Sequence, residues 1–187
     1  MNPTTKAIEA LSSSDDPILA RELEALNNLH KALKEIDDGI PPPPSQVAPK
    51  RSAVIERMRQ TGNNAFRKAN FPEAVKLYTH AITMALTRPA WEPSTLLGGE
   101  LQQLYANRAQ AHMSMNDWPE ALADVNASIE LKKAGNPKAH WRKGKCLKEM
   151  GRFEEARDAL EYGLEFGSDP ELGNMLKEVN KSLEQRQ

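Results

Sequence analysis

Several ingredients are scarce in this 187-residue chain, and each shortage argues against a class of protein. Cys146 is the single cysteine, so no internal disulfide can form, and such cysteine usage is typical of a reducing compartment. Aromatic residues make up only 5% of the chain and charged residues 27%, which favours a helical, well-solvated fold over a β-sandwich.

Long apolar runs and a surplus of charge are also missing. No stretch approaches about 20 consecutive apolar residues, so the sequence predicts no membrane span, and its start lacks the short apolar core of a signal peptide. The formal net charge of −1 argues against general nucleic-acid binding, because that depends on a broadly basic surface. Any membrane address would therefore come from a partner protein.

Residues with catalytic or metal-binding chemistry are present but not grouped. Four histidines show no metal-ligand spacing and are expected in packing or surface roles: His30, His80, His112 and His140. Cys146 precedes Leu147 within a predicted helix, which is typical of a buried, inert thiol. Paired catalytic carboxylates and nucleophile–base spacings are missing, so we expect no enzyme, no cofactor and no metal.

The N-terminal part of the chain reads as a separate appendage. Its first sixteen residues are small and polar and predict a mobile start. Pro17 then opens a helical pattern that runs to about residue 37, Gly39 ends it, and residues 41–44 form a stiff polyproline spacer. We therefore divide the chain into an appendage at 1–50 and a second domain at 51–187. The helix could dock on the second domain, but the spacer favours binding to a partner.

From residue 52 onward the chain repeats one helical pattern. Three stretches align: NFPEAVKLYTHAI at 70–82, DWPEALADVNASI at 117–129 and RFEEARDALEYGL at 152–164. Each opens a helix with an alanine at the same place, and each follows another amphipathic helix. The stretch ELGNMLKEVNKSLEQ at 171–185 predicts a terminal helix that covers the apolar side of the last repeat.

Small residues recur at fixed positions of these units. One column contains Gly62, Ala109 and Gly144, and a second contains Ala81, Ser128 and Gly163. Small side chains at these places predict that the two helices of a repeat approach closely. The stretch RPAWEPSTLLGGE at 88–100 lengthens the connection between the first and second repeats, and its prolines and glycines predict an inserted loop.

The units resemble the tetratricopeptide repeat, a helix–turn–helix motif of 34 residues. The match covers about residues 52–169 and rests on residues that fit the family's consensus: Gly62, Ala74, Tyr78, Ala81, Tyr105, Ala109, Ala121, Gly144 and Ala156. Met58 and His140 stand where a large aromatic residue is usual. The resemblance implies an all-α fold, namely a three-repeat solenoid with a C-terminal capping helix and an N-terminal helical appendage.

Such a solenoid has a concave face lined by the first helix of each repeat, and helical phase selects the residues that point inward. Five polar residues form the predicted peptide-binding set: Arg59, Asn63, Asn107, Lys138 and Arg142. A secondary groove set lies beside them: Phe66, Gln110, Met113, Trp141 and Lys145. No acidic residue is among these positions, so the cations are predicted to be unpaired and to suit a carboxylate ligand.

Simpler interpretations of the same residues stay open. Lys138 and Arg142 could form an ordinary solvated basic face. Phe66 and Met113 could belong to the core, and Trp141 could pack between repeats. Lys143 points away from the inward set.

The inward set resembles the dicarboxylate clamp of chaperone-binding tetratricopeptide domains. Four residues match that family in type and place: Asn63, Asn107, Lys138 and Arg142. Arg59 replaces a lysine, which keeps the charge and changes the geometry. The resemblance implies a ligand that ends in Glu-Glu-Val-Asp, the tail of seventy- and ninety-kilodalton heat-shock chaperones, and it does not rank the two classes.

The order of features also resembles the small tetratricopeptide subunits of fungal translocation complexes at the endoplasmic reticulum. The shared features are the appendage, the three repeats, the PAWEP insertion and the segment GRFEEARDALEYGLEF. The resemblance implies a peripheral protein on the cytoplasmic face of that membrane, attached through its N-terminal region to a membrane-anchored subunit. The alternatives are a structural scaffold without a tail ligand and a co-chaperone without a role in translocation.

Overall fold

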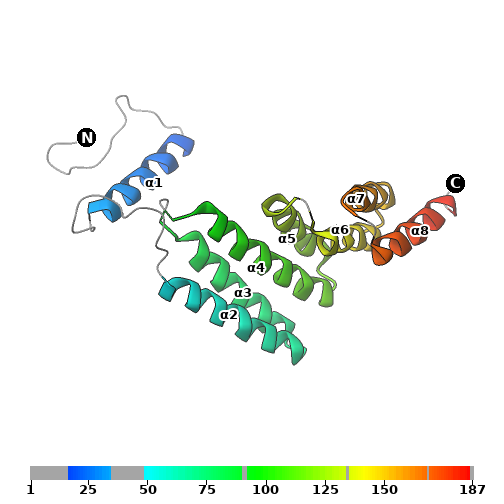
Figure 1. Ribbon diagram of the computed structural model, residues 1–187, viewed down its shortest axis with the longest axis horizontal. Helices are drawn as coiled ribbons and strands as arrows, with labels where there is room; N and C mark the ends of the chain where they lie inside the picture. Colours follow the sequence, from blue (N-terminus) through cyan, green and yellow to red (C-terminus); the bar gives the residue numbers. More distant parts are fainter. Residues whose placement is uncertain (1–16, 35–48, 90–91, 134, 168, 186–187) are drawn as a thin grey trace. The chain divides into compact units, whose positions relative to one another are not determined.

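A computed structural model describes residues 17–34, 49–89, 92–133, 135–167 and 169–185, and their regular structure is entirely α-helical (Figure 1). The helices are α1 (Pro17–Lys34), α2 (Pro49–Arg67), α3 (Phe71–Leu86), α4 (Ser94–Ser114), α5 (Trp118–Leu131), α6 (Pro137–Glu149), α7 (Phe153–Glu165) and α8 (Pro170–Glu184). The all-α prediction is confirmed. The chain divides into two compact units: residues 1–47 with 88–94, and residues 48–87 with 95–187.

The first unit contributes helix α1. This helix leaves Ile18 and Leu26 largely exposed, at 64% and 47% of their surface. It begins at the predicted Pro17 and is described as far as Lys34. The predicted mobile start, the last residues of the predicted helix and the polyproline spacer lie outside the described residues. Arg88 and Glu92, which belong to the same unit, form a buried ion pair.

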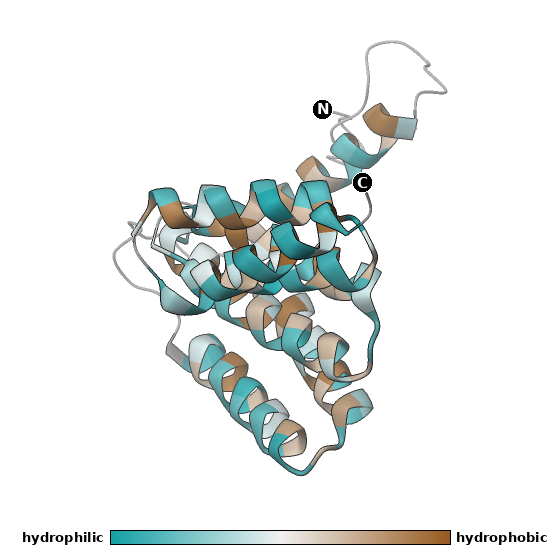
Figure 2. Cartoon of the chain, turned by 90° about the vertical axis from the view of Figure 1, so that its right-hand side faces the viewer, coloured by the Kyte–Doolittle hydropathy of each residue, from teal (hydrophilic) through white to brown (hydrophobic). Residues whose placement is uncertain are grey.

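The second unit consists of three helix pairs and a final helix. The pairs are α2 with α3 and α6 with α7, which pack on each other, and α4 with α5, which are joined by Arg108 and Asp124. Helix α8 packs against α6 and α7. Hydrophobic residues lie between the helices and hydrophilic residues cover their outer turns (Figure 2). This arrangement confirms the predicted three repeats and capping helix.

The turn inside each repeat has the same backbone geometry. Ala69, Asn116 and Gly151 have φ values of 57°, 62° and 76°, the left-handed conformation that ends a helix. The next residue in each turn donates its backbone N–H to a carbonyl five positions earlier, with N–O distances of 3.0, 3.0 and 2.9 Å. These bonds satisfy carbonyls at the end of the first helix and turn the chain into the second.

The small-residue columns allow the close approach that they predict. A Cβ atom on Gly62 would lie 2.6 Å from the Tyr78 ring, and a Cβ on Gly144 would lie 2.5 Å from Leu160. Both distances are far below van der Waals contact, so a larger residue would force the facing side chain or its helix to move. The requirement for small residues at these positions is therefore confirmed.

The predicted loop at 88–100 is wrong for its second half. Helix α4 already begins at Ser94 and runs through Gly98 and Gly99. A helical glycine costs about 1 kcal/mol relative to alanine. Burial opposes this cost, because Leu101 and Leu104 are 6% and 0% exposed within the core of the first repeat. Tertiary packing thus overrides the local glycine signal.

Arg108 forms a buried ion pair within the second repeat and a hydrogen bond to the first. Arg108 of α4 donates two hydrogen bonds to Asp124 of α5, both at 2.7 Å, and a third to the Thr79 hydroxyl of α3 at 2.9 Å. Asp124 is 5% exposed. The carboxylate raises the pKa of the Arg108 guanidinium, mainly through its hydrogen bonds. One arginine therefore holds three helices together.

None of the helices in the described part of the chain is long and apolar enough to cross a membrane.

Candidate peptide-binding site

Two asparagines from different repeats meet at the centre of the predicted set. Asn107 of α4 donates its side-chain N–H to Oδ1 of Asn63 of α2, at 3.1 Å, and the Tyr78 hydroxyl donates to the same oxygen at 2.7 Å. Both acceptor positions of that oxygen are therefore used. The orientation of the Asn63 amide is fixed, and its NH₂ group stays available to donate to a ligand.

A second contact continues this line onto the third repeat. Arg142 of α6 donates its Nε–H to Oε1 of Gln110 of α4, at 3.0 Å. Gln110 lies three residues after Asn107, so both occupy one face of α4. The structure thus connects Asn63, Asn107, Gln110 and Arg142 in a polar row across α2, α4 and α6. We call these four residues the polar row.

Arg142 supplies the positive charge of the polar row. Burial lowers the pKa of its guanidinium, although arginine remains charged at neutral pH. No carboxylate of the described residues forms an ion pair with it. A half-buried charge with only a neutral amide partner is costly, and a ligand carboxylate would reduce that cost.

The prediction that all five cations and amides are free of acidic neighbours is wrong for Arg59. Glu56, one turn earlier on α2, accepts hydrogen bonds from Nε and Nη2 of Arg59 at 2.8 and 2.7 Å, and from Gln60 at 2.8 Å. Arg59 lowers the pKa of Glu56, so the pair is charged at neutral pH. A ligand carboxylate must therefore compete with Glu56 for the guanidinium group of Arg59.

Lys138 lies at the other end of the site in a hollow of about 340 Å³. The hollow is lined by Trp141 of the same helix and by Asp169, Pro170 and Glu171 at the start of α8. Lys138 is exposed, and the described residues form no ion pair with it. Its ammonium group is thus open to a ligand, with two acidic residues on the far wall.

The secondary groove set separates into core and surface. Met113 is 5% exposed and packs against Ala121 and Cys146, so it forms core instead of groove wall, and that prediction is wrong. Phe66 is half-buried on the first-repeat core, with its ring centroid 5.2 Å from that of Phe71. Its role is therefore mainly packing.

Trp141 and Lys145 act as a pair on α6. The Lys145 ammonium lies 5.2 Å from the centroid of the Trp141 ring, a cation–π contact. Trp141 also packs against the core between the second and third repeats. Both interpretations of Trp141 thus hold, since it packs between the repeats and lines the hollow that contains Lys138.

The sequence reasoning missed four residues of this region: Glu56, Tyr78, Asp169 and Glu171. The contact of Glu56 with Arg59 could have been predicted, because a glutamate three residues before an arginine on a helix can form an ion pair with it. The bond from Tyr78 to Asn63 joins positions 15 residues apart, and helical periodicity carries no sign of it. Asp169 and Glu171 approach Lys138 only because α8 folds back over α6.

Metal and thiol chemistry find no support in the described residues. They contain no group of histidine, cysteine and acidic side chains that could hold a metal ion. Cys146 is completely buried, and burial raises its thiol pKa to about 11. The predicted burial of this thiol is confirmed, and a buried protonated thiol is a poor nucleophile.

Replacing Tyr78 by phenylalanine should weaken ligand binding without unfolding the chain. The substitution removes the hydroxyl that fixes the Asn63 amide and keeps the ring against Gly62. One neutral hydrogen bond is worth about 1 kcal/mol, so we expect about five-fold weaker binding of a peptide ending in Glu-Glu-Val-Asp. Titration calorimetry measures this. His80→Ala, an exposed change on the same helix, is the control and should leave affinity unchanged.

Replacing Glu56 by glutamine should strengthen binding of the same peptide. The change removes the carboxylate that occupies the Arg59 fork. Partly exposed pairs are worth at most about 1 kcal/mol, so we expect up to about a five-fold gain in affinity, decreasing with salt. The control is Glu73→Gln on α3, which should change nothing. Weaker binding in Glu56→Gln would mean that Glu56 supports the site instead of competing with the ligand.

Comparison with known proteins indicates the class of protein to which the chain belongs. No family model matches the sequence. The "First TPR of Spaghetti (RPAP3) bound to HSP90 peptide SRMEEVD" has a TM-score of 0.59 and 23% identity, covering 71% of this chain and 94% of that one. A relative from Arabidopsis thaliana, the E3 ubiquitin-protein ligase CHIP, is 31% identical over 71% of this chain and 43% of its own length. With the repeat geometry above, the chain belongs to the tetratricopeptide-repeat family.

One relative is much more similar in sequence. The chain is 40% identical to the "ER protein translocation subcomplex subunit sec67" of Schizosaccharomyces pombe, over 67% of this chain and 66% of that protein. A chain in the cryo-EM structure of the Sec complex from S. cerevisiae has a TM-score of 0.81 and 24% identity, covering 99% of this chain and 97% of that one. The second similarity shows the fold.

Proposed function

We propose that the chain is a receptor for chaperone tails on the translocation machinery of the endoplasmic reticulum. Its ligand is a free carboxyl terminus of the Glu-Glu-Val-Asp type. Arg142, Lys138 and Arg59 bind the carboxylates, while Asn63 and Asn107 hold the terminal residue and its backbone. Capture of the tail brings a chaperone, with its precursor protein, to the translocation complex.

The polar row is the observation that carries this proposal. It puts oriented amides from two repeats beside a half-buried, unpaired arginine from the third. Similar folds bind such tails: one RPAP3 domain is in complex with the HSP90 peptide SRMEEVD and another with the HSP70 peptide SGPTIEEVD. Both peptides end in an aspartate, which carries a side-chain carboxylate and a terminal carboxylate. The three cations Arg59, Lys138 and Arg142 can bind these two groups.

The place of action is supported by the relative in fission yeast, a subunit of an ER protein translocation subcomplex. The described residues offer no membrane-spanning helix, so attachment through a membrane-anchored partner is the consistent arrangement. We assign that contact to the N-terminal appendage, because α1 exposes Ile18 and Leu26 on its surface. The tail site belongs to the second unit, so the two contacts use different surfaces.

A titration tests the tail site. The full chain is titrated with a labelled peptide ending in Glu-Glu-Val-Asp, and with the same peptide carrying an amidated C-terminus. We expect roughly micromolar binding of the free acid, about −8 kcal/mol, and at least ten-fold weaker binding of the amide. Equal affinity for both peptides, or binding to neither, would remove the clamp from the function and leave the scaffold role.

A second experiment tests the appendage. The double variant Ile18→Asp, Leu26→Asp places two charges on the exposed apolar side chains of α1. We expect it to lose association with membranes that carry the translocation complex and to keep full affinity for the free-acid peptide. The control is Arg21→Glu, Glu22→Arg, which exchanges an exposed pair on the same helix. Unchanged membrane association of the aspartate variant would assign attachment to another surface.

A further inference from the structure

One face of helix α2 carries positive charge from its first turn to its last. Six exposed residues lie within about 40° of one direction around this helix: Lys50, Val54, Arg57, Thr61, Asn64 and Lys68. We call these six residues the basic stripe, since they include three cations and no acidic residue. Arg59 and Asn63 lie on the opposite face of the same helix. The basic stripe is therefore separate from the proposed tail site.

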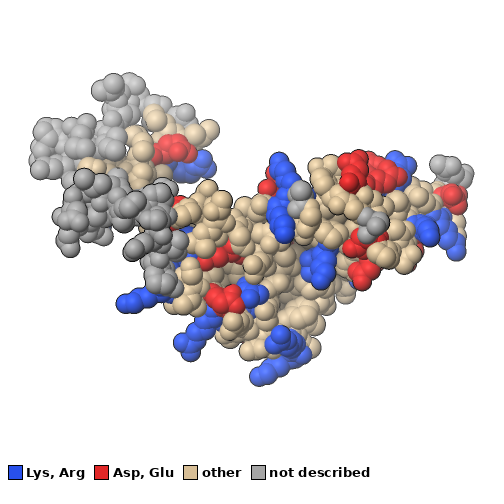
Figure 3. All heavy atoms as spheres, in the orientation of Figure 1, with Lys and Arg blue, Asp and Glu red and all other residues tan. Residues whose placement is uncertain are grey.

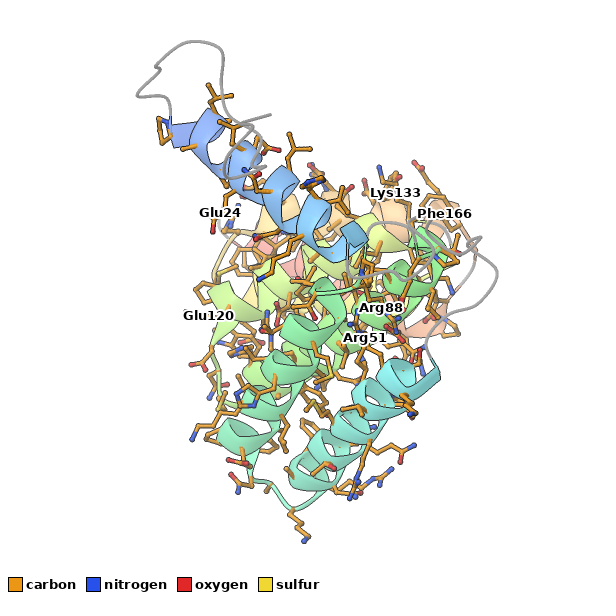
Figure 4. All side chains as sticks on the ribbon, turned by 90° about the vertical axis from the view of Figure 1, so that its left-hand side faces the viewer. Glu24, Arg51, Arg88, Glu120, Lys133 and Phe166 are labelled. Atoms are coloured by element: carbon orange, nitrogen blue, oxygen red, sulfur yellow. The ribbon has the colours of Figure 1, made fainter. Side chains whose placement is uncertain are left out.

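The cations of the basic stripe have no acidic partner among the described residues. Lys50, Arg57 and Lys68 take part in none of the ion pairs that these residues form. Arg67, beside the stripe, donates to the neutral amide oxygen of Asn64 at 3.0 Å. Figure 4 shows side chains with nitrogen tips that project outward from α2, the cyan helix. These positive charges are thus exposed and available to an anionic partner.

The basic stripe differs from an ordinary solvated face, on which charges of both signs are mixed. Residues 48–87 contain seven lysines and arginines but only two glutamates, although the whole chain has a net charge of −1. Figure 3 shows Lys and Arg side chains along the outer edge of α2, at the bottom of the view. The exposed residues of α8, at the other end of the repeats, include both signs: Lys177, Lys181, Glu171, Glu178 and Glu184.

The spacing of the three cations suits an extended anionic surface better than a small anion. Lys50 and Lys68 lie at opposite ends of the stripe, about 27 Å apart at 1.5 Å per residue. Side chains spread over that length cannot converge on one carboxylate or phosphate. A hollow of about 170 Å³ beside α2 is lined by other faces of this helix, including Ser52 and Ile55, and by α4. Recognition by the stripe therefore depends on charge and not on a shaped pocket.

We propose that the basic stripe is a membrane contact, which binds the headgroups of anionic phospholipids. Exposed lysines and arginines bind such a surface by charge alone, because each gains from the negative surface potential of the membrane. The choice of a membrane over another anionic surface rests on the proposed function, which puts the chain at the endoplasmic reticulum. Because Arg59 and Asn63 lie on the opposite face of α2, a chain bound through the stripe keeps its tail site open to a chaperone.

Sedimentation with lipid vesicles tests this contact. The full chain is mixed with vesicles of phosphatidylcholine alone, and with vesicles that also contain about 30% phosphatidylserine. We expect the chain to bind only the second kind, and we expect this binding to weaken as salt is added. The triple variant Lys50→Gln, Arg57→Gln, Lys68→Gln should bind about 100-fold more weakly, because each exposed cation contributes about five-fold.

The matched control removes three exposed lysines that lie outside the first repeat: Lys132→Gln, Lys177→Gln and Lys181→Gln. It makes the same change in net charge and should bind the anionic vesicles as the original chain does. Equal weakening by the two triple variants would overturn the proposal, because binding would then depend on net charge alone. Binding of the original chain to complete membranes but not to pure anionic vesicles would assign the stripe to an acidic protein and equally overturn it.

Failure of the membrane contact is distinguishable from failure of the tail site. Pure vesicles contain neither a chaperone nor a translocation complex, so binding to them does not depend on the tail site. The stripe variant should keep full affinity for the free-acid peptide, and circular dichroism shows whether it keeps its helices. If the triple variant does not fold, the single variant Arg57→Gln decides, and it should weaken vesicle binding about five-fold. Unchanged vesicle binding by Arg57→Gln would count against the stripe.

Discussion

Replacing Arg108 by methionine is expected to lower the free energy of unfolding by about 3–5 kcal/mol. The methionine keeps most of the side-chain volume but leaves the carboxylate of Asp124, which is 5% exposed, without its two hydrogen bonds. The bond to Thr79 is lost as well. For a chain of this size the melting temperature should fall by about 10 °C, which thermal unfolding followed by circular dichroism measures.

Two further variants distinguish the cost of leaving the Asp124 carboxylate unpaired from the cost of losing an arginine side chain. The double variant Arg108→Met, Asp124→Leu removes the unpaired carboxylate and should recover at least half of the lost stability. Arg157→Met breaks the exposed ion pair between Arg157 and Asp158, whose two side chains are 41% and 67% exposed. This variant should change the free energy of unfolding by less than about 0.5 kcal/mol. Equal effects of Arg108→Met and Arg157→Met would show that the contacts of Arg108 with Asp124 and Thr79 do not stabilise the fold.

Replacing Arg142 by alanine is expected to weaken binding of the free-acid tail peptide about 30-fold, or about 2 kcal/mol. Arg142 is the half-buried cation at the end of the polar row, and alanine removes both its charge and its contact with Gln110. The amidated peptide should lose much less, because it lacks the terminal carboxylate. Titration calorimetry of both peptides checks this difference.

A matched pair of variants keeps the Arg142 result interpretable. Lys143→Ala changes the next residue, which lines a different hollow together with residues of α5 and α7, and should leave tail affinity unchanged. Lys138→Ala removes an exposed side chain, so it should weaken the tail without affecting the fold. If Lys143→Ala weakens the tail as much as Arg142→Ala does, the effect of these variants is general loss of positive charge and not a specific clamp.

Much of the fold follows from the sequence by itself. The repeated alanines and small-residue columns predict paired helices, because 3.6-residue periodicity and close helix contact are local requirements. The same periodicity puts Arg59 with Asn63, and Lys138 with Arg142, on one face of their helices. The start of α4 could not be predicted in this way. Two glycines in a row read as a loop, and only the burial of Leu101 and Leu104 outweighs them.

The tertiary structure alone decides how the site residues meet. The bonds from Tyr78 and Asn107 to Asn63, and from Arg142 to Gln110, span 15, 44 and 32 positions. Contacts at such separations depend on how the repeats stack, which no local pattern encodes. The hollow lined by residues of α5, α6 and α7 arises in the same way, because it forms only when α6 packs against both other helices. The sequence by itself thus determined the helices and their inward faces, while packing decided which side chains are bound, buried or left free.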